Sequence, residues 1–436
     1  MEKLMEIAKK VSDKVEIYSL EQITDLISFE NAKLKDVDSK LQSGFSLRIM
    51  KDRKMGFAFT KNLVDRNEFL QNALNSLKGG AKANFDLPLT EDSPKLNTYD
   101  PSIEDLTNTT IVDECNRICE LLAPKTSGQV NIYAGRVINR IRLINSNGTD
   151  LSTNLSFYYT YNSIMYPGGY SSISRETIYK KFEKTPDDCL HYILSTYNKS
   201  IKEINPKGGK MKVLFLPETM YVLMWRVLSA TSGKSIYEKQ SPIADKLGAR
   251  IFDKKLTIYN DSLNDKMPGA RSFDDEGTLC QHLPIVEDGI LKNFYYDLHY
   301  ANKLNTKPTG HGFRSAVWGG DSITIKPTPS LNHLYIKPGD KSFEELIRSI
   351  DRGIIAAGAL GAHSGNIPNG DFSIGLNPAL YVENGKIVGF VKDAMAAGNI
   401  YEVMKNVLDV ENTLYPATMG TFPAVLFDNV SVATKS

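Results

Sequence analysis

Cysteine and histidine are scarce in this chain of 436 residues, and neither sign of charge is in excess. The four cysteines, Cys115, Cys119, Cys189 and Cys280, are too few and too scattered to form a disulfide framework. No apolar run is long enough to span a membrane, and the N-terminus lacks the apolar segment of a signal peptide. The 52 basic and 51 acidic side chains leave a formal charge of +1, which argues against a nucleic-acid-binding protein. We therefore expect a compact cytoplasmic protein with neither a membrane nor a nucleic-acid partner.

Motifs that would identify a catalytic centre are also missing. No two of the six histidines lie three, four or five residues apart, the spacing that lets one helix present two imidazoles to a metal ion. The chain has no phosphate-binding loop, no dinucleotide-binding glycine motif and no nucleophile elbow. A metal site would need distant residues such as Cys280, His311 and His363. From the residues alone we expect no catalytic motif or cofactor in this chain, and a metal held by such distant residues stays open.

The pattern of apolar residues predicts an α+β fold with antiparallel sheets and flanking helices. In the first half we expect strands at 15–18, 23–30, 45–50, 55–59, 130–133, 137–144 and 151–161. Helices are expected at 4–11, 63–77, 105–122 and 186–204. The stretch 78–102 is rich in Gly, Pro, Asn and Asp, which indicates a long surface connection.

Asn205-Pro206-Lys207-Gly208-Gly209-Lys210 is the best candidate for a domain boundary. We therefore expect an N-terminal α+β region at 1–205, for which a further division near 80–105 stays open, and a larger, strand-rich C-terminal domain at 206–436. In the second region the sequence predicts helices at 217–231, 343–356 and 403–407. Two similar hairpins, at 286–291 and 382–387, suggest an antiparallel sheet built from such units.

Several polar or aromatic clusters have both a functional and a structural interpretation. Asp274-Asp275-Glu276-Gly277 could raise carboxyl pKa values or hold a cation, or it could be a solvated turn. His311 and His363 lie in glycine-rich loops, where the backbone can approach a ligand closely. Five tyrosines could cover a sheet face or line a groove: Tyr158, Tyr159, Tyr161, Tyr166 and Tyr170.

The order of short motifs along the chain resembles that of the TldD/PmbA family, labelled modulator of DNA gyrase in older usage. The matching segments in the second half are 274–277, 286–291, Tyr296-Asp297, a glycine-rich stretch ending at Arg314, Ser364-Gly365-Asn366, 370–375, 382–387 and Ala397-Gly398-Asn399. In the first half they are 44–48, 56–59 and 145–148. The resemblance covers nearly the whole chain, and the motifs follow one another in the family's order.

The resemblance implies a two-subunit peptidase that processes peptides. In that family the TldD subunit carries a His-Glu-x-x-x-His zinc motif on the first helix of the C-terminal half, and the PmbA (TldE) subunit lacks it. On the corresponding helix, 217–231, Trp225, Arg226 and Ala230 stand at the motif positions, and the whole helix has no histidine. Tryptophan cannot ligate zinc, and arginine cannot act as a general base.

The resemblance therefore implies a PmbA/TldE-type subunit that holds no metal. Its partner would be a TldD-like subunit that binds the zinc, the substrate would be a peptide, and the chain could form a homodimer when alone. We hypothesise that the glycine-rich loops and the tyrosine-rich face line a peptide groove or a subunit interface. The candidate residues are Asp274, Asp275, His311, Arg314, His363, Asn366 and Asp371.

Two other functions stay open at this point. The chain could hydrolyse peptides alone, with a metal held by distant ligands or with another catalytic set. It could instead be a regulatory binding protein that acts on gyrase or another partner without proteolysis.

Overall fold

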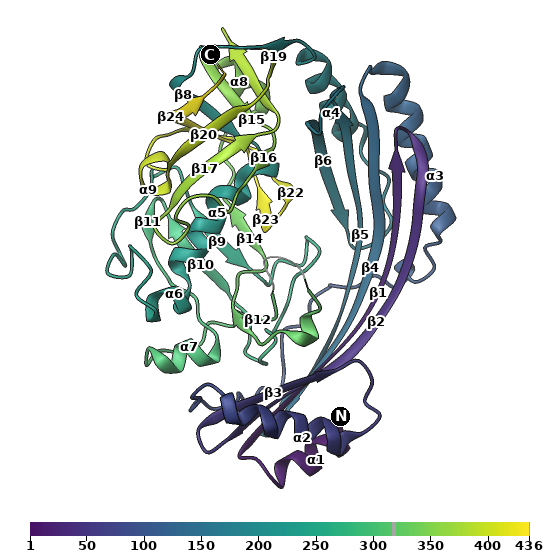
Figure 1. The fold of residues 1–436 in the computed structure, drawn as a ribbon, viewed down its shortest axis with the longest axis vertical. Helices are drawn as coiled ribbons and strands as arrows, with labels where there is room; N and C mark the ends of the chain where they lie inside the picture. The colour runs from purple at the N-terminus through teal and green to yellow at the C-terminus, as the bar shows by residue number, and fades with distance from the viewer. Residues whose placement is uncertain (316–319, 436) are drawn as a thin grey trace.

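The computed structural model describes residues 1–315 and 320–435 and has the expected α+β fold (Figure 1). The first half of the chain forms one six-stranded antiparallel sheet of long, curved strands. In spatial order they are β3 (Lys54–Thr60), β2 (Lys33–Lys51), β1 (Lys14–Glu30), β4 (Gln129–Asn145), β5 (Asp150–Met165) and β6 (Ser172–Tyr179). The two strands expected at 15–18 and 23–30 are one strand, β1.

The sequence pattern did not predict the first half of β2. All residues from Lys33 to Leu41 are exposed, so this segment has no buried face to produce an alternation of apolar and polar residues. The strand follows a tight turn at Asn31 and Ala32, whose φ angles of 50° and 57° are typical of a two-residue hairpin turn.

Four helices pack on this sheet. α1 (Glu2–Lys9) and α2 (Arg66–Ser76) close one end, while α3 (Asn108–Leu122) packs over β1 and β4, and α4 (Asp187–Lys199) packs over β5 and β6. The apolar face of α3 buries Cys115 and Cys119, as expected for small apolar side chains. The helices predicted at 105–122 and 186–204 are present, but each is shorter than predicted.

The connection between α2 and α3 is more than a surface loop. Ala83, Phe85 and Leu87 are buried, and they pack with Leu298 of the second half. This part of the prediction was wrong because Gly, Pro and Asp residues around them dominate the local composition. The segment thus fastens the two halves of the chain to each other.

The second half is built on a ten-stranded, mostly antiparallel sheet, in which β8–β15 and β7–β19 are parallel pairs. Its strands are β7 (Glu203–Ile204), β8 (Gly209–Phe215), β15 (Arg352–Ala356), β16 (Ala359–Leu360), β17 (Asp371–Leu376), β18 (Ala379–Glu383), β19 (Lys386–Val391), β20 (Ala394–Asn399), β21 (Val407–Val410) and β24 (Val425–Ala433). Since β7 belongs to this sheet, the second structural unit takes in residues just before the expected boundary at 205.

A second six-stranded sheet completes the C-terminal half. It contains β9 (Ile258–Asp261), β10 (His282–Glu287), β11 (Ile290–Leu291), β14 (Leu334–Ile336), β22 (Tyr415–Ala417) and β23 (Gly420–Phe422). A short pair joins β12 (Gly312–Phe313) to β13 (Thr328–Pro329). The helices are α5 (Pro217–Thr231), α6 (Gly233–Tyr237), α7 (Leu298–Lys303), α8 (Phe343–Arg348) and α9 (Ile400–Val403). No helix of the described chain is both long and apolar enough to cross a membrane.

Both predicted hairpins are present, with positive φ at Asp288 and Gly289 and at Asn384 and Gly385. They lie in different sheets, so they are not repeated units of one sheet. The helix predicted at 343–356 ends at Arg348, and β15 follows it as a central strand. The last helix is also displaced, because α9 ends at Val403 and β21 begins at Val407.

Candidate functional site

Helix α5 lies at the centre of the molecule, between the two sheets of the C-terminal half (Figure 1). Pro217 occupies its first turn, where a missing N–H costs nothing. Most of its residues are buried, which explains why its apolar residues extend around most of the helix. At the three motif positions, Trp225 is half-buried while Arg226 and Ala230 are fully buried.

Arg226 binds the backbone of a distant loop. Its Nη1 donates to the carbonyl of Val222 on the same helix at 2.6 Å, and its Nε donates to the carbonyl of Asp371 at 2.6 Å. Its Nη2 donates to the carbonyls of Ala362 at 3.1 Å and Ser364 at 2.8 Å. The guanidinium therefore fixes both ends of the loop 361–371 to α5, and we call this arrangement the arginine clamp.

Backbone carbonyls, rather than a carboxylate ion pair, satisfy this buried cation. Burial lowers the pKa of Arg226 to about 10, and the nearby charge of Asp371 opposes that shift. The carboxylate of Asp371 accepts a hydrogen bond from Asn399 Nδ2 at 2.8 Å. Arg226 therefore stays charged at neutral pH, and its hydrogen bonds to backbone carbonyls fill the space around its guanidinium.

The clamped loop carries three of the candidate residues. Gly361, Gly365 and Gly370 have φ angles of 70°, 97° and 89°, so the chain reverses sharply over a short length. His363 and Asn366 are exposed on the loop, and Asp371 starts β17 at its end. The structure therefore brings His363, Asn366 and Asp371 together on one loop beside α5.

The predicted Asp274–Glu276 cluster is buried rather than solvated. Asp274 Oδ2 accepts from the backbone N–H of Gly312 at 2.8 Å, and its Oδ1 accepts from the N–H groups of Glu276 and Thr278. Burial raises the pKa of Asp274 well above its usual value, and the charge of Glu276 adds to the shift. Asp274 therefore organises the turn itself and has no surface for a ligand.

Asp275 joins the same turn to two arginines. Its Oδ1 accepts from Arg271 Nη2 at 2.9 Å, and its Oδ2 accepts from the backbone N–H of Arg314 at 2.8 Å. The guanidinium of Arg314 donates to the carbonyl of Ile325 at 2.7 Å and to Glu16 Oε1 at 3.2 Å. Asp274, Asp275 and Arg314 are thus brought together, although mainly by structural bonds.

Glu16 and Arg48, which the sequence analysis missed, complete a buried ion network between the two halves. Arg48 Nη2 lies 2.5 Å from Glu16 Oε2 within the first sheet, and Arg48 Nη1 lies 2.6 Å from Glu276 Oε1. All three side chains are almost completely buried. Glu16 and Arg48 each stand at a polar position in a strand segment where polar and apolar residues alternate, so no local motif distinguishes them.

His311 is fully buried and is separate from the loop that carries His363. Its Nε2 pairs with Asn260 Nδ2 at 3.0 Å, and its Nδ1 pairs with Thr309 Oγ1 at 3.0 Å. Burial lowers the pKa of His311 to about 4, so the imidazole is neutral at neutral pH. Because no part of its side chain is exposed, His311 supports the fold and does not itself face a groove.

A large cleft separates the N-terminal sheet from α5 and α6 and has a volume of about 1110 Å³. Gln22, Asn139 and Phe157 come from the sheet, while Trp225 and Ser229 come from α5. The candidates Asp275 and Arg314 also line this cleft. The tyrosine-rich face that the sequence suggested does not line this cleft. Tyr158 is buried against α3, and Tyr170 lies by a separate pocket.

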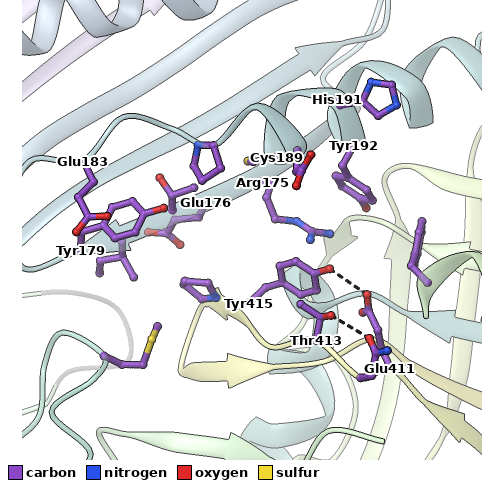
Figure 2. Close-up of a pocket in the computed structure, with 18 of the residues that line it drawn as sticks. Arg175, Glu176, Tyr179, Glu183, Cys189, His191, Tyr192, Glu411, Thr413 and Tyr415 are labelled. Carbon is purple, nitrogen blue, oxygen red and sulfur yellow. Dashed lines mark hydrogen bonds between the residues drawn. The ribbon is translucent and has the colours of Figure 1, made fainter. Parts of the chain in front are cut away.

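A second cavity of about 930 Å³ lies between β6 and α4 on one side and α8 and β22 on the other (Figure 2). Here the Arg175 guanidinium is stacked between the rings of Tyr192 and Tyr415, 3.9 Å from each ring centre. Arg175 Nε is 2.7 Å from Glu218 Oε1, and Tyr415 donates to Glu411 at 3.0 Å. These contacts join the two halves of the chain a second time.

The side chains at the three motif positions of α5 do not fit a zinc ion. Trp225 and Ala230 offer no ligand atom, and the Arg226 guanidinium is a cation already bonded to carbonyls. Among residues 1–315 and 320–435, no group of three or more His, Cys, Asp and Glu side chains is arranged to hold a metal ion. We therefore derive no chemical step through a metal in this chain.

Comparison with known proteins identifies the family of this chain. The model of the PmbA/TldA metallopeptidase C-terminal domain matches residues 208–434, and that of the PmbA/TldA metallopeptidase domain 1 matches residues 15–78. The chain belongs to the PmbA/TldD family. The predicted resemblance is thus confirmed, and both halves of the chain take part in it.

Relatives in this family match the chain over nearly its whole length. An uncharacterized protein of Methanocaldococcus jannaschii is 26% identical over 420 residues, which cover 94% of this chain and 95% of that protein. A metalloprotease of the same organism is 24% identical over 424 residues, covering 93% of this chain and 90% of its own. A metalloprotease PmbA homolog of Buchnera aphidicola is 22% identical, covering 98% and 95%.

Solved structures share the fold. TldE from Thermococcus kodakarensis superposes with a TM-score of 0.90 at 22% identity, covering 99% of both chains. A protein of Thermotoga maritima, described as a candidate modulator of a DNA gyrase, gives a TM-score of 0.85 at 25% identity and also covers 99% of both chains. The long curved sheet and the C-terminal half are therefore features of the family fold.

Proposed function

We propose that this chain is the subunit without catalytic metal of a heteromeric, TldD/TldE-type metallopeptidase that processes peptides. A TldD-like subunit would supply the zinc ion and the groups that activate water. The family membership supports a role in proteolysis, and the similarity to a TldE fold is consistent with the non-metal subunit.

The arginine clamp is the observation that carries this proposal. A zinc motif needs imidazoles and a carboxylate that are free to reach the ion. In this chain the middle position of the motif holds a guanidinium whose donors bind four carbonyl groups. Loss of the Arg226 side chain would take one donor from each of those carbonyls and release the loop from α5, so the helix is organised for loop attachment instead of metal binding.

The large cleft supports a role for this subunit in holding the substrate. Its two walls, the N-terminal sheet and the α5–α6 surface, can exclude water and orient an extended peptide. Trp225 contributes an aromatic surface on α5. Gln22 Nε2 donates to Asn139 Oδ1 at 2.9 Å, which leaves the Gln22 side-chain oxygen and the Asn139 side-chain nitrogen for hydrogen bonds to a peptide. In the proposed complex these groups position the peptide while the partner performs the chemistry.

His363 and Asn366 are the candidates we assign to the subunit contact. Both are exposed on the loop that Arg226 holds in place, so they can reach a partner without unfolding the loop. Asp371 acts behind them through its carbonyl bond to Arg226. Asp274 and His311, being buried, would affect pairing only by changing the fold.

Reconstitution tests the proposal. The chain and a TldD-like subunit from the same genome are purified separately, and cleavage of an unstructured peptide is followed with each alone and with both. We expect no cleavage by this chain alone, and chelator-sensitive cleavage by the mixture. Chelator-sensitive cleavage by this chain alone, or cleavage by the TldD-like subunit that this chain does not alter, would contradict the proposal.

A further inference from the structure

The cavity of about 930 Å³ beside β6, which we call the β6 cavity, takes no part in the proposed peptidase role. β6 is the last strand of its sheet, so the cavity reaches around the free edge of the strand to side chains of both faces. The volume is in the range of pockets that hold small molecules. Five arginine and lysine side chains and six carboxylates line it. This balance does not match a ligand that carries charge of one sign alone.

Arg175 presents the outer edge of its guanidinium to the β6 cavity (Figure 2). The rings of Tyr192 and Tyr415 cover its two faces, and its Nε lies 2.7 Å from Glu218 Oε1. Within residues 1–315 and 320–435, no carbonyl or carboxylate oxygen accepts a hydrogen bond from Nη1 or Nη2. The side chain is only 5% exposed, so few water molecules can take that place. Two parallel N–H groups thus remain for an acceptor, and a carboxylate matches their geometry.

Glu411 lies near Arg175 but is not that acceptor. Its Oε1 accepts from the hydroxyl group of Tyr415 at 3.0 Å, and its Oε2 accepts from the backbone N–H of Ala424 at 3.0 Å. The ion pairs of the described chain include none between Glu411 and Arg175. A carboxylate from outside the chain would therefore satisfy Nη1 and Nη2 without displacing a protein group.

A second part of the β6 cavity carries carboxylates without a cation. Figure 2 shows Glu176 and Glu183 on the side of Tyr179, away from the Arg175 stack. In the part of the chain that the structure describes, neither carboxylate forms an ion pair or a hydrogen bond. Burial raises the pKa of Glu176, and the charge of Glu218 adds to the shift. A cation placed here would stabilise the charged form of Glu176.

The lysine that follows β6 does not supply this cation. Lys180 Nζ donates to the backbone carbonyl of Asn97 at 2.9 Å and to that of Asp265 at 2.8 Å. Its ammonium group is therefore held at the connection between the two halves. An ammonium group from a ligand could instead lie between the two carboxylates and against the ring of Tyr179.

We propose that the β6 cavity binds a small zwitterion of the amino-acid type, in the size range from a free amino acid to a tripeptide. The ligand's carboxylate accepts hydrogen bonds from Nη1 and Nη2 of Arg175. Its ammonium group pairs with Glu176 and Glu183 beside Tyr179. The balanced lining is then complementary to a ligand that carries both charges. A simple anion such as phosphate would gain only the Arg175 contact and would meet the carboxylates of the lining.

The β6 cavity adjoins the large cleft but is a separate site. Glu176, Ile178, Met267, Pro268 and Pro416 line both. Binding of a zwitterion here requires neither a metal-bearing subunit nor cleavage of a peptide. Short products released from the cleft are one source of such a ligand, and that source rests on the proposed function. Free amino acids are the other source and do not depend on it.

Isothermal titration calorimetry on the full chain tests the proposal with three probes: alanine, di-alanine and tri-alanine. We expect at least one of them to bind as one molecule per chain. Amidation of its carboxylate and acetylation of its amino group should each weaken binding by about tenfold or more, because each removes one charged contact. Inorganic phosphate should not displace the probe. Tightest binding of alanine would identify a free amino acid as the ligand, and tightest binding of di- or tri-alanine would identify a short peptide.

Two variants assign the ends of the ligand to their residues. Arg175→Gln should bind the free and the amidated probe equally, because the contact to the carboxylate is lost. Glu176→Gln should likewise reduce the preference for the free amino group over the acetylated one. These readouts compare two ligands on one protein, so a general loss of stability does not imitate them.

A variant that fills the cavity leaves Arg175 in place. Ser195 lies on the face of α4 that carries Asp188, Tyr192 and Lys199, all of which line the β6 cavity. Ser195→Trp should therefore abolish binding while circular dichroism stays unchanged. Asn198→Trp is the matched control, because residue 198 is exposed on the same helix outside the lining and should bind as the unmodified chain does.

Three results would overturn the proposal: no binding of any of the three probes, equally tight binding of the capped and free forms, or binding that Ser195→Trp leaves intact. The titrations use this chain alone. Failed peptide cleavage in the reconstitution would therefore bear on the proposed function and not on this site.

Discussion

Arg48 Nη1 and Glu276 Oε1 lie 2.6 Å apart although 228 residues separate them in the sequence. This ion pair connects the N-terminal sheet to the Asp274–Glu276 turn of the C-terminal half. Arg48 also binds Glu16, and Glu16 binds Arg314, so the pair is part of a continuous buried network. The acidic cluster that the sequence singled out therefore fixes how the two halves lie against each other, and with them the walls of the cleft.

Removing Arg48 should strongly destabilise the protein. Arg48→Met leaves Glu16 and Glu276 buried without their cation, and we expect the free energy of unfolding to fall by about 3–5 kcal/mol. Urea denaturation followed by circular dichroism measures this change. Arg142→Met is the matched control, because the ion pairs of Arg142 are exposed and should contribute about 1 kcal/mol or less. Equal effects of the two variants would contradict the assignment.

Loss of the arginine clamp should loosen the loop 361–371 more than the rest of the protein. Arg226→Met removes the donors to the carbonyls of Ala362, Ser364 and Asp371, and we expect a loss of about 3 kcal/mol. Hydrogen exchange should increase first at this loop and at the start of β17. Arg226→Lys keeps the charge but not the planar set of donors, so it should give an intermediate effect. Unchanged exchange in the loop would count against the clamp.

Stability should depend on pH through His311. Burial lowers its folded-state pKa to about 4, below the usual 6.5, so the unfolded chain binds the proton more readily. The stabilisation is complete above about pH 6.5 and is lost as the pH falls toward 4, at about 1.4 kcal/mol per unit. Asp274, with its raised pKa, acts in the opposite direction, so the comparison must isolate His311.

The difference in unfolding free energy between the unmodified chain and His311→Asn isolates the contribution of His311. Unfolding free energies measured from pH 7.5 to 4.5 should converge as the pH falls, because the variant has no imidazole to protonate. Parallel curves for the two proteins would show that His311 titrates normally in the folded state.

Tyr415 should stabilise the contact between the two halves mainly through its ring. Tyr415→Leu removes one face of the Arg175 stack, and we expect a loss of about 2 kcal/mol. Tyr415→Phe keeps the ring and loses only the hydrogen bond to Glu411, so it should cost about 1 kcal/mol. Thermal unfolding of both variants measures the difference, and a larger effect of Tyr415→Phe would refute the stacking argument.

Local signals in the sequence predicted local structure well. The Asp288-Gly289 and Asn384-Gly385 turns were located correctly because positive φ angles require such residues. The helix at 343–356 was predicted too long because Phe343, Leu346 and Ile350 have helical spacing, and the apolar residues continue into β15. What makes β15 a strand is its pairing with β8, about 140 residues earlier in the chain, which no local pattern records.

The candidate site could be predicted only in part, because contacts between distant segments again leave no local signal in the sequence. The resemblance located Trp225, Arg226 and Ala230 on one helix, and α5 is that helix. It could not indicate the clamp, because three of the four carbonyls that Arg226 binds come from a loop more than 130 residues away. Arg175 likewise had no signal, since its stacking partners come from α4 and β22.

Metal content of the separate subunits tests the central claim most directly. The chain and a TldD-like subunit are each purified alone, dialysed against the same trace of zinc, and measured by inductively coupled plasma mass spectrometry. The account predicts about one zinc ion per TldD-like chain and a negligible amount in this chain, and the same amounts after the two are mixed. One tightly held zinc ion per molecule of this chain alone, lost on substitution of α5 residues, would contradict it.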